Sequence, residues 1–382
     1  MRQFSSFGAL DGAVVRLFKE RRAGAMLFYL FHFSLNMLVG KFLLFYRKKS
    51  WYKFFTIVQL TLIAGLRAGS VGIDTYTYIS YFERLGGAQS AVEAIQRLNW
   101  VEPGYALLNY IVYISGGNAH AVFFICAAVI HVLSVDFIFE YSKSPVWGMF
   151  FLFTFPFFYD SMCFIRSTMA GTVFLFSLRY VKQRKFIRYL LTISVGAMFH
   201  IMLVLCLPLY VLYKINWKRR RSIAAFLLLD MIAFLCILPI RDFVMWVLRR
   251  EAYSGYTGIN YWIGQNSGGW RTAVFFTLFF LGAYYFYYVK GKHTDDENLL
   301  AGYGFCLPLC ALLFPTAQVI IRFMILFMPV CGAFIARELS LIQNRNNRII
   351  MKWFYFLLGT AFQIYTISNN ALGFVPYVPL WK

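Results

Sequence analysis

Acidic residues are scarce in this sequence, and charge of either sign is low. The 382 residues include 16 Asp and Glu against 37 Lys and Arg, and only 14% of the chain is charged. Soluble domains contain about a quarter charged residues. Because 60% of the residues are hydrophobic, an ordinary soluble domain is excluded. The composition indicates an all-α, polytopic integral membrane protein.

Motifs for metal, nucleotide and nucleophile chemistry are also missing. The seven Cys include no CxxC pair, and the five His show no metal-ligand spacing. Nothing resembles a P-loop or the GxSxG motif of a nucleophilic serine. We therefore expect no metal, no cofactor and no coupling to ATP, and we expect the Cys to be core residues.

The positive charge that is present has a simple explanation. A net charge of +21 would suggest nucleic acid as the partner of a soluble domain. Here the basic residues lie mostly in short clusters between apolar runs, as the positive-inside rule describes. We expect contact with membrane lipids and none with nucleic acid.

The apolar runs predict about 10–12 transmembrane helices in one domain, residues 24–367. A basic segment, residues 1–23, precedes the domain and can lie on the membrane surface. An extracytoplasmic tail, residues 368–382, follows it. Two long outer loops are expected, at 67–103 and at 241–270. The alternation of spans puts the basic N-terminus outside, against the charge rule.

Two apolar stretches do not fit simple crossings, the first because of its length and the second because of the charges at its ends. Residues 105–115 are expected to dip into the membrane and return, with a short tilted crossing as the alternative. Residues 189–213 have basic clusters at both ends. A pair of re-entrant half-helices that meet near His200 satisfies this pattern.

Residues 65–82 combine a cation, glycines and an acid at the end of an apolar run. Arg67 ends the run, Gly69 and Gly72 allow a tight backbone, and Asp74 follows. Because a guanidinium fork fits phosphate oxygens, the stretch suits an anionic ligand at the membrane surface. The alternative is that Arg67 only reaches lipid headgroups.

Arg166 and Arg322 fall on the same outer face, each at the end of a predicted span. Charge near the membrane interior is expensive and suggests a function. Together with Arg67, these residues can hold a lipid pyrophosphate, and phospholipid headgroups are the alternative partner.

Three residues are candidates for acid–base chemistry. Asp74 and Glu102 flank the first outer loop, where either can accept a proton from a sugar hydroxyl. The alternative is that each pairs with a nearby Arg. His200, at the tip of the second re-entrant pair, is a further candidate base or a hydrogen-bonded core residue.

These motifs, taken in order, resemble the signature of the EpsG-like polymerases over about residues 55–377. Ser167 stands where that family often has Gln, which leaves the role of that side chain open. The matching segments are Gly65-Leu-Arg67, Val71 to Thr75 with Tyr78, Glu102 to Tyr105, Ile165 to Ala170 with Leu178 to Tyr180, Phe199-His200, Arg322-Phe323 and Pro376-Tyr377.

The resemblance implies a polysaccharide polymerase of the bacterial cytoplasmic membrane that acts at its periplasmic face. A growing glycan on undecaprenyl pyrophosphate is the implied donor, and a lipid-linked repeat unit is the implied acceptor. No metal or cofactor is required, and a partner that regulates chain length is left open.

Site residues follow from the resemblance together with the chemistry of their side chains. Asp74 is the first choice for the base, with Glu102 and His200 next. The expected pyrophosphate-binding residues are Arg67, Arg166 and Arg322. The expected sugar-binding residues are Tyr76, Tyr78, Tyr105 and Tyr377, although interfacial anchoring is the alternative for any one of them.

Two other functions remain open. A flippase for the same lipid-linked sugars would favour inverted repeats and charges at the bilayer midplane, whereas the predicted charges gather at one face. A membrane acyltransferase that modifies a surface glycan would need a catalytic residue such as His200 on the side of its acyl donor.

Overall fold

The fold is all-helical, in agreement with the prediction. The structure, a computed structural model, describes residues 5–225, 227–228, 231–232, 269–290, 292–314 and 320–381. The predicted outer loop 241–270 therefore lies outside the described residues except for its last two. The only β-type pairing in the described ranges is an isolated bridge between Arg67 and Pro379.

As far as Lys214, the described helices follow one another with short connections. They are α1 (Ser5–Phe45), α2 (Lys49–Gly65), α3 (Thr75–Glu83), α4 (Ala91–Arg97), α5 (Pro103–Ile114), α6 (Ala119–Tyr141), α7 (Pro145–Thr154), α8 (Phe157–Cys163), α9 (Ile165–Lys182), α10 (Phe186–Ala197), the 3₁₀ helix η1 (Ile201–Lys214), α13 (Gly269–Val289), α14 (Asp295–Leu313), α15 (Ile321–Leu341) and α16 (Arg345–Asn369).

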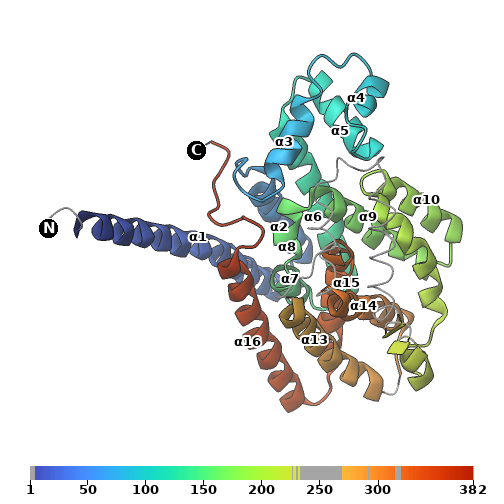
Figure 1. The fold of residues 1–382 in the computed structure, drawn as a ribbon. Coiled ribbons are helices and arrows are strands. Elements are labelled where there is room, and N and C mark those ends of the chain that lie inside the picture. The colour runs from blue at the N-terminus through green and yellow to red at the C-terminus, as the bar shows by residue number, and fades with distance from the viewer. Residues whose placement is uncertain are drawn as a thin grey trace.

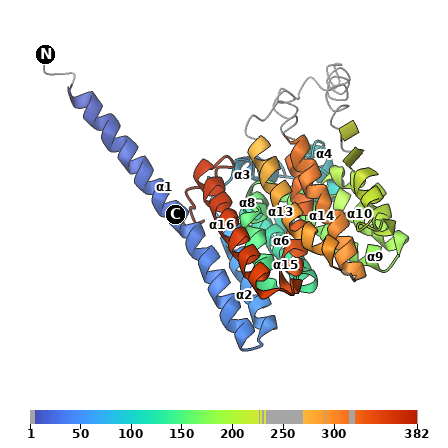
Figure 2. The same cartoon turned by 90° about the horizontal axis from the view of Figure 1, so that it is seen from below.

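The helices form a bundle from which one long helix projects (Figures 1 and 2). The first half of α1 extends away from the body, and its second half runs beside α2 and α16. The short helices α3, α4 and α5 gather at one end of the bundle, at the top of Figure 1. The C-terminal tail returns from α16 toward that end.

Four described helices are long and apolar enough to cross a membrane: Met26–Phe45, Ala119–Tyr141, Gly269–Val289 and Ile321–Leu341. The pair α7 and α8, bent by 51° at its break, makes a fifth if it counts as one span. The chain is therefore a multi-pass membrane protein. These helices are those of the described residues alone, so the expected total of ten to twelve crossings for the whole chain stays a prediction.

The two stretches expected to be re-entrant both form short helices. Residues 105–115 fall almost wholly within α5, which has 12 residues. Residues 189–213 form α10 and η1, of 12 and 14 residues, and the break between them lies at Met198 to His200, close to the predicted tip. Whether either stretch re-enters the membrane stays a prediction.

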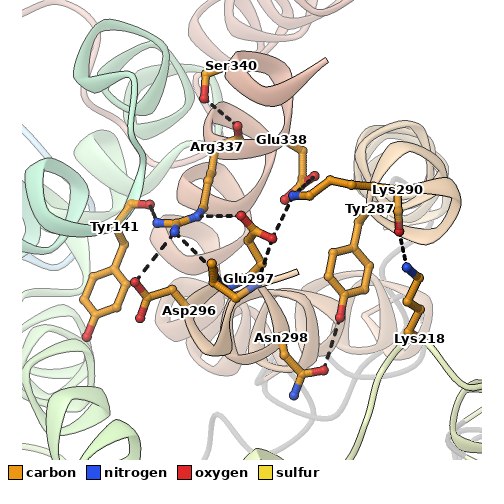
Figure 3. A network of polar contacts seen from close by, with 11 residues as sticks. Tyr141, Lys218, Tyr287, Lys290, Asp296, Glu297, Asn298, Arg337, Glu338 and Ser340 are labelled. Carbon is orange, nitrogen blue, oxygen red and sulfur yellow. Dashed lines mark hydrogen bonds and ion pairs between the residues drawn. The ribbon is translucent and has the colours of Figure 1, made fainter. Parts of the chain in front are cut away.

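Buried charges join the helices at the end of the bundle away from α3, α4 and α5. Arg337, near the end of α15, donates to the Tyr141 carbonyl at 3.0 Å and lies 3.6 Å from carboxylate oxygens of both Asp296 and Glu297. Lys290 lies 2.7 Å from Glu297 and 3.8 Å from Glu338. Figure 3 shows that the network ties the start of α14 to the ends of α13, α15 and α6.

The charges of this network form pairs of opposite sign, and this pairing makes their burial tolerable. Arg337, Glu297 and Glu338 are at most 5% exposed. Removing one partner of a buried ion pair leaves the other charge without compensation. The network therefore acts as a clamp whose members depend on one another.

We expect Arg337→Ala to lower the free energy of unfolding by about 3–5 kcal/mol, the usual cost of an uncompensated buried charge. Unfolding by SDS titration in mixed micelles measures this change. The matched control is Arg345→Ala, because Arg345 is exposed at the start of α16. A loss for Arg337→Ala no larger than that of the control would contradict the clamp.

Candidate active site

The turn after α2 is shaped by a glycine that no other residue can replace without strain. Gly72 has φ +94°, and a Cβ there would lie 2.9 Å from Thr75 Oγ1 and 3.1 Å from the Met162 carbonyl oxygen. Thr75 Oγ1 donates to the Val71 carbonyl at 2.6 Å. The turn thus brings the chain from the end of α2 to Asp74, the residue before α3.

The C-terminal tail is bonded along this turn. The Ala68 amide donates to the Val378 carbonyl at 2.8 Å, and the Gly72 amide donates to the Gly373 carbonyl at 2.9 Å. In the opposite direction, the Leu380 amide donates to the Leu66 carbonyl at 2.8 Å. The tail therefore acts as a strap that holds residues 66–73 in place.

Arg67 lies beneath the turn and is 1% exposed. Its guanidinium donates to the Ala64 carbonyl, at the end of α2, and to the Met162 carbonyl in α8, the second at 2.8 Å. It also packs 4.9 Å from the centroid of the Phe123 ring. A cation among the last carbonyls of two helices is favourable for both helix dipoles. Arg67 therefore joins α2 to α8.

Beside the turn lies a polar cavity of about 200 Å³. Its wall combines residues from α3, from the start of α9, from the break between α10 and η1, and from the start of α15. The lining residues are Asp74, Thr77, Tyr78, Tyr81, Phe164, Arg166, Ser167, His200 and Arg322. Four of the predicted site residues other than tyrosines thus meet here: Asp74, Arg166, His200 and Arg322.

Glu102 lies beside Arg166 of the cavity wall, and both of its carboxylate oxygens have partners. One carboxylate oxygen forms an ion pair with Arg166, and the other accepts from the Ile201 amide at 3.2 Å. The next residues dock the loop onto the end of α10, because the Gly104 amide donates to the Met198 carbonyl at 2.8 Å. A Cβ at Gly104 would lie 2.7 Å from that oxygen, which explains the glycine of this motif.

His200 lies between Glu102 and Arg322. Its Nε2 is 3.0 Å from a guanidinium nitrogen of Arg322, and its Nδ1 is 3.8 Å from the Glu102 carboxylate. Because Arg can only donate, Nε2 must accept. Burial, followed by the charges of Arg322 and Arg166, lowers the pKa of His200 to about 3. The imidazole is therefore neutral and holds Arg322 in position.

Asp74 differs from Glu102 because its carboxylate forms no hydrogen bond or ion pair with any residue that the structure describes. Burial raises the pKa of Asp74 above its ordinary value of 3.8, and the charges of Arg322 and Arg166 oppose that rise. Of the three candidate bases, it is the one that lines the cavity with no hydrogen-bond or ion-pair partner in the described part of the chain.

The four tyrosines predicted to bind sugar lie in different places. Tyr78 lines the cavity, and Tyr105 is buried behind it, with ring centroids 5.7 Å apart. Tyr76 is on the surface and 65% exposed. Tyr377 belongs to the strap, where it stacks on Phe28 at 4.3 Å and donates to a carbonyl of α2. Of these four tyrosines, Tyr78 is the one that belongs to the described wall of the cavity.

The cavity also contains residues that the sequence analysis did not single out as site residues: Thr77, Tyr81, Phe164 and Ser167. One signal was available for the first two. Asp74, Thr77, Tyr78 and Tyr81 follow the spacing i, i+3, i+4, i+7, which places them on one face of a helix. No group of three or more His, Cys, Asp and Glu gathers in the described part of the chain.

The fold and the cavity define a multi-pass membrane protein with a cationic, carboxylate-bearing site at one end of its helices. The sequence matches the EpsG family over residues 50–378 and belongs to that family, which is associated with exopolysaccharide biosynthesis. The predicted resemblance is thereby confirmed. No curated protein and no solved structure matches the chain.

We expect Arg67→Ala to act on stability, because it would remove charged hydrogen bonds to two helix ends, each of which contributes about 1.5–3 kcal/mol. The free energy of unfolding in mixed micelles should fall by roughly 3 kcal/mol or more, with a smaller loss for Arg67→Lys. Arg188→Ala, on the exposed face of α10, is the control. A normally stable Arg67→Ala would refute this role.

Proposed function

We propose that this protein is a polysaccharide polymerase that transfers a growing glycan from undecaprenyl pyrophosphate onto a lipid-linked repeat unit. One observation carries the proposal. The cavity joins two guanidinium groups, from Arg166 and Arg322, to the carboxylate of Asp74, which has no partner among the residues that the structure describes. Fixed cations and a free base are what the reaction needs at its leaving group and at its nucleophile.

The transfer is a single exchange of bonds at the anomeric carbon of the donor sugar. The bond from that carbon to the pyrophosphate oxygen breaks, and a bond to the acceptor hydroxyl oxygen forms. Asp74 takes the hydroxyl proton. Arg166 and Arg322 stabilise the negative charge that develops on the departing pyrophosphate, an effect that is strong in a site with little water.

Glu102 and His200 serve this chemistry as positioning residues. Glu102 fixes Arg166 through an ion pair, and His200 fixes Arg322 through Nε2. Both are occupied by these contacts and so are poorly placed to take a proton from an acceptor. Arg67 supports the cavity from beneath, through α2 and α8.

The cavity faces the periplasm in this proposal, and the membrane is the bacterial cytoplasmic membrane. The support is the distribution of lysines. Lys48, Lys49 and Lys53 lie at the start of α2, whereas its other end leads to the cavity. By the positive-inside rule the lysine-rich end is cytoplasmic.

Polymerisation of purified lipid-linked repeat units by the full-length protein in nanodiscs tests the proposal. Wild type should yield a ladder of products. Asp74→Asn should lower the rate by about 10²–10⁴-fold, and Arg166→Ala or Arg322→Ala by about 10²–10³-fold. Glu83→Gln is the matched control, because Glu83 is an exposed carboxylate on the same helix, α3.

The outcomes separate the polymerase from its rivals. No ladder from folded wild type, given its cognate unit, would overturn the polymerase and favour the flippase or the acyltransferase. A ladder that survives Asp74→Asn and both Arg substitutions would keep the function and overturn the site.

The pH dependence of kcat/KM provides a separate test of Asp74. A general base must be ionised, and the pKa of Asp74 is raised, so the rate should fall on the acid side at a pH above 3.8. Arg322 opposes the rise in the pKa of Asp74. As the pH is lowered, the residual activity of Arg322→Gln should therefore begin to fall at a higher pH than the activity of wild type. If the activity of both proteins falls at the same pH, the role of Asp74 as the general base is contradicted.

A further inference from the structure

Aromatic side chains continue from the wall of the cavity to the protein surface. The Arg166 guanidinium lies 5.8 Å from the centroid of the Tyr81 ring, and Tyr81 lines the cavity. The centroid of the Trp100 ring lies 6.4 Å from that of Tyr81. Trp100 is 42% exposed. A continuous path of rings therefore leads from the cation of the cavity to solvent.

Trp100 is held firmly although it is exposed. Its neighbours Leu98 and Val101 are buried, and the Val101 amide donates to the Leu98 carbonyl at 2.8 Å. The Arg84 guanidinium lies 4.8 Å from the centroid of the Trp100 ring, a cation–π contact that fixes the orientation of the ring. Two residues later, Glu102 pairs with Arg166. The loop that presents Trp100 is thus anchored to the cavity itself.

The chemistry of this surface suits a carbohydrate. A pyranose ring presents a face of C–H groups that packs against an aromatic ring, and Tyr and Trp combine a large apolar face with a polar group. The guanidinium of Arg84 adds hydrogen-bond donors beside Trp100 for the hydroxyl groups of a sugar. A rigid indole is well suited to this task because little conformational freedom is lost on binding.

We propose that Tyr81 and Trp100 form a glycan subsite, here called the Tyr81–Trp100 subsite, for the sugars next to the one at the cavity. Binding of glycan at this subsite does not require that the protein catalyses the transfer. The further consequence, that the subsite retains the growing chain between transfers and so lengthens the product, rests on the proposed function.

The competing occupant of an exposed Trp in a membrane protein is the lipid interface. The surroundings of Trp100 favour the glycan. Trp100 follows α4, a short helix whose Glu93 and Arg97 form an ion pair, and it stacks with Arg84. These charged side chains stand next to the indole itself, whereas the exposed apolar side chains of the neighbouring helices include Val92 on α4 and Ile111 and Ile114 on α5.

Binding of lipid-free oligosaccharides to the full-length protein in nanodiscs tests the subsite. The probe is the set of oligosaccharides released by mild acid from the polymer of the bacterium that makes this protein, with saturation-transfer NMR as the readout. Trp100→Ala should weaken binding about tenfold, the effect of losing one stacked ring, and Trp100→Phe should retain most of it. Trp51→Ala is the matched control, because Trp51 is exposed on α2.

Product length gives the second readout. In the polymerisation assay, Trp100→Ala should shift the ladder to shorter products relative to both wild type and Trp51→Ala. Unchanged binding and unchanged length in Trp100→Ala would overturn the subsite. Loss of membrane insertion without loss of binding would do so as well, in favour of an interfacial anchor. Binding that depends on Trp100 in a protein that makes no ladder would sustain the subsite and overturn the polymerase.

Discussion

The two hydrogen-bonded contacts of the Arg67 guanidinium are the interaction on which the candidate site depends. They join the carbonyl end of α2 to α8. From those two helix ends the chain runs directly to Asp74 in one direction and to Arg166 in the other. The separation between the acid and the cation across the cavity is therefore set by a buried charge that never reaches the cavity. The strap formed by the C-terminal tail covers the same turn and excludes water from this contact.

A second chain of contacts divides the polar residues of the cavity into occupied and free groups. Glu102 holds Arg166, and His200 holds Arg322 while it faces Glu102. Glu102 and Arg166 have opposite charges, which makes their burial tolerable, and Arg322 is held by a neutral imidazole. Asp74 is the carboxylate of the cavity that has no hydrogen-bond or ion-pair partner among the described residues. The difference between Asp74 and Glu102 is thus one of surroundings, since the two side chains have the same chemistry.

The helical, membrane-embedded class of the protein and most of its site could be predicted, because composition and short motifs depend on local sequence. The break near His200 was also predicted, since basic clusters on both sides of an apolar run allow few other arrangements. The role of Arg67 could not be predicted. Snorkelling, ligand binding and capping of two helix ends all begin from the same Arg at the end of an apolar run. Only the contact with Met162, 95 residues away, distinguishes them.

The number of crossings in the whole chain stays a prediction, since an apolar run does not state whether its helix continues straight, bends or stops. α15 illustrates what the tertiary structure adds. It carries Arg322 at its start and Arg337 near its end, about 22 Å apart at 1.5 Å per residue. Arg322 belongs to the cavity and Arg337 to the buried clamp at the other end of the bundle. α15 runs without interruption from Ile321 to Leu341, with Pro329 inside it, so the cation of the cavity and the clamp belong to one helix. The charges at the two ends are therefore linked through the length of a single helix.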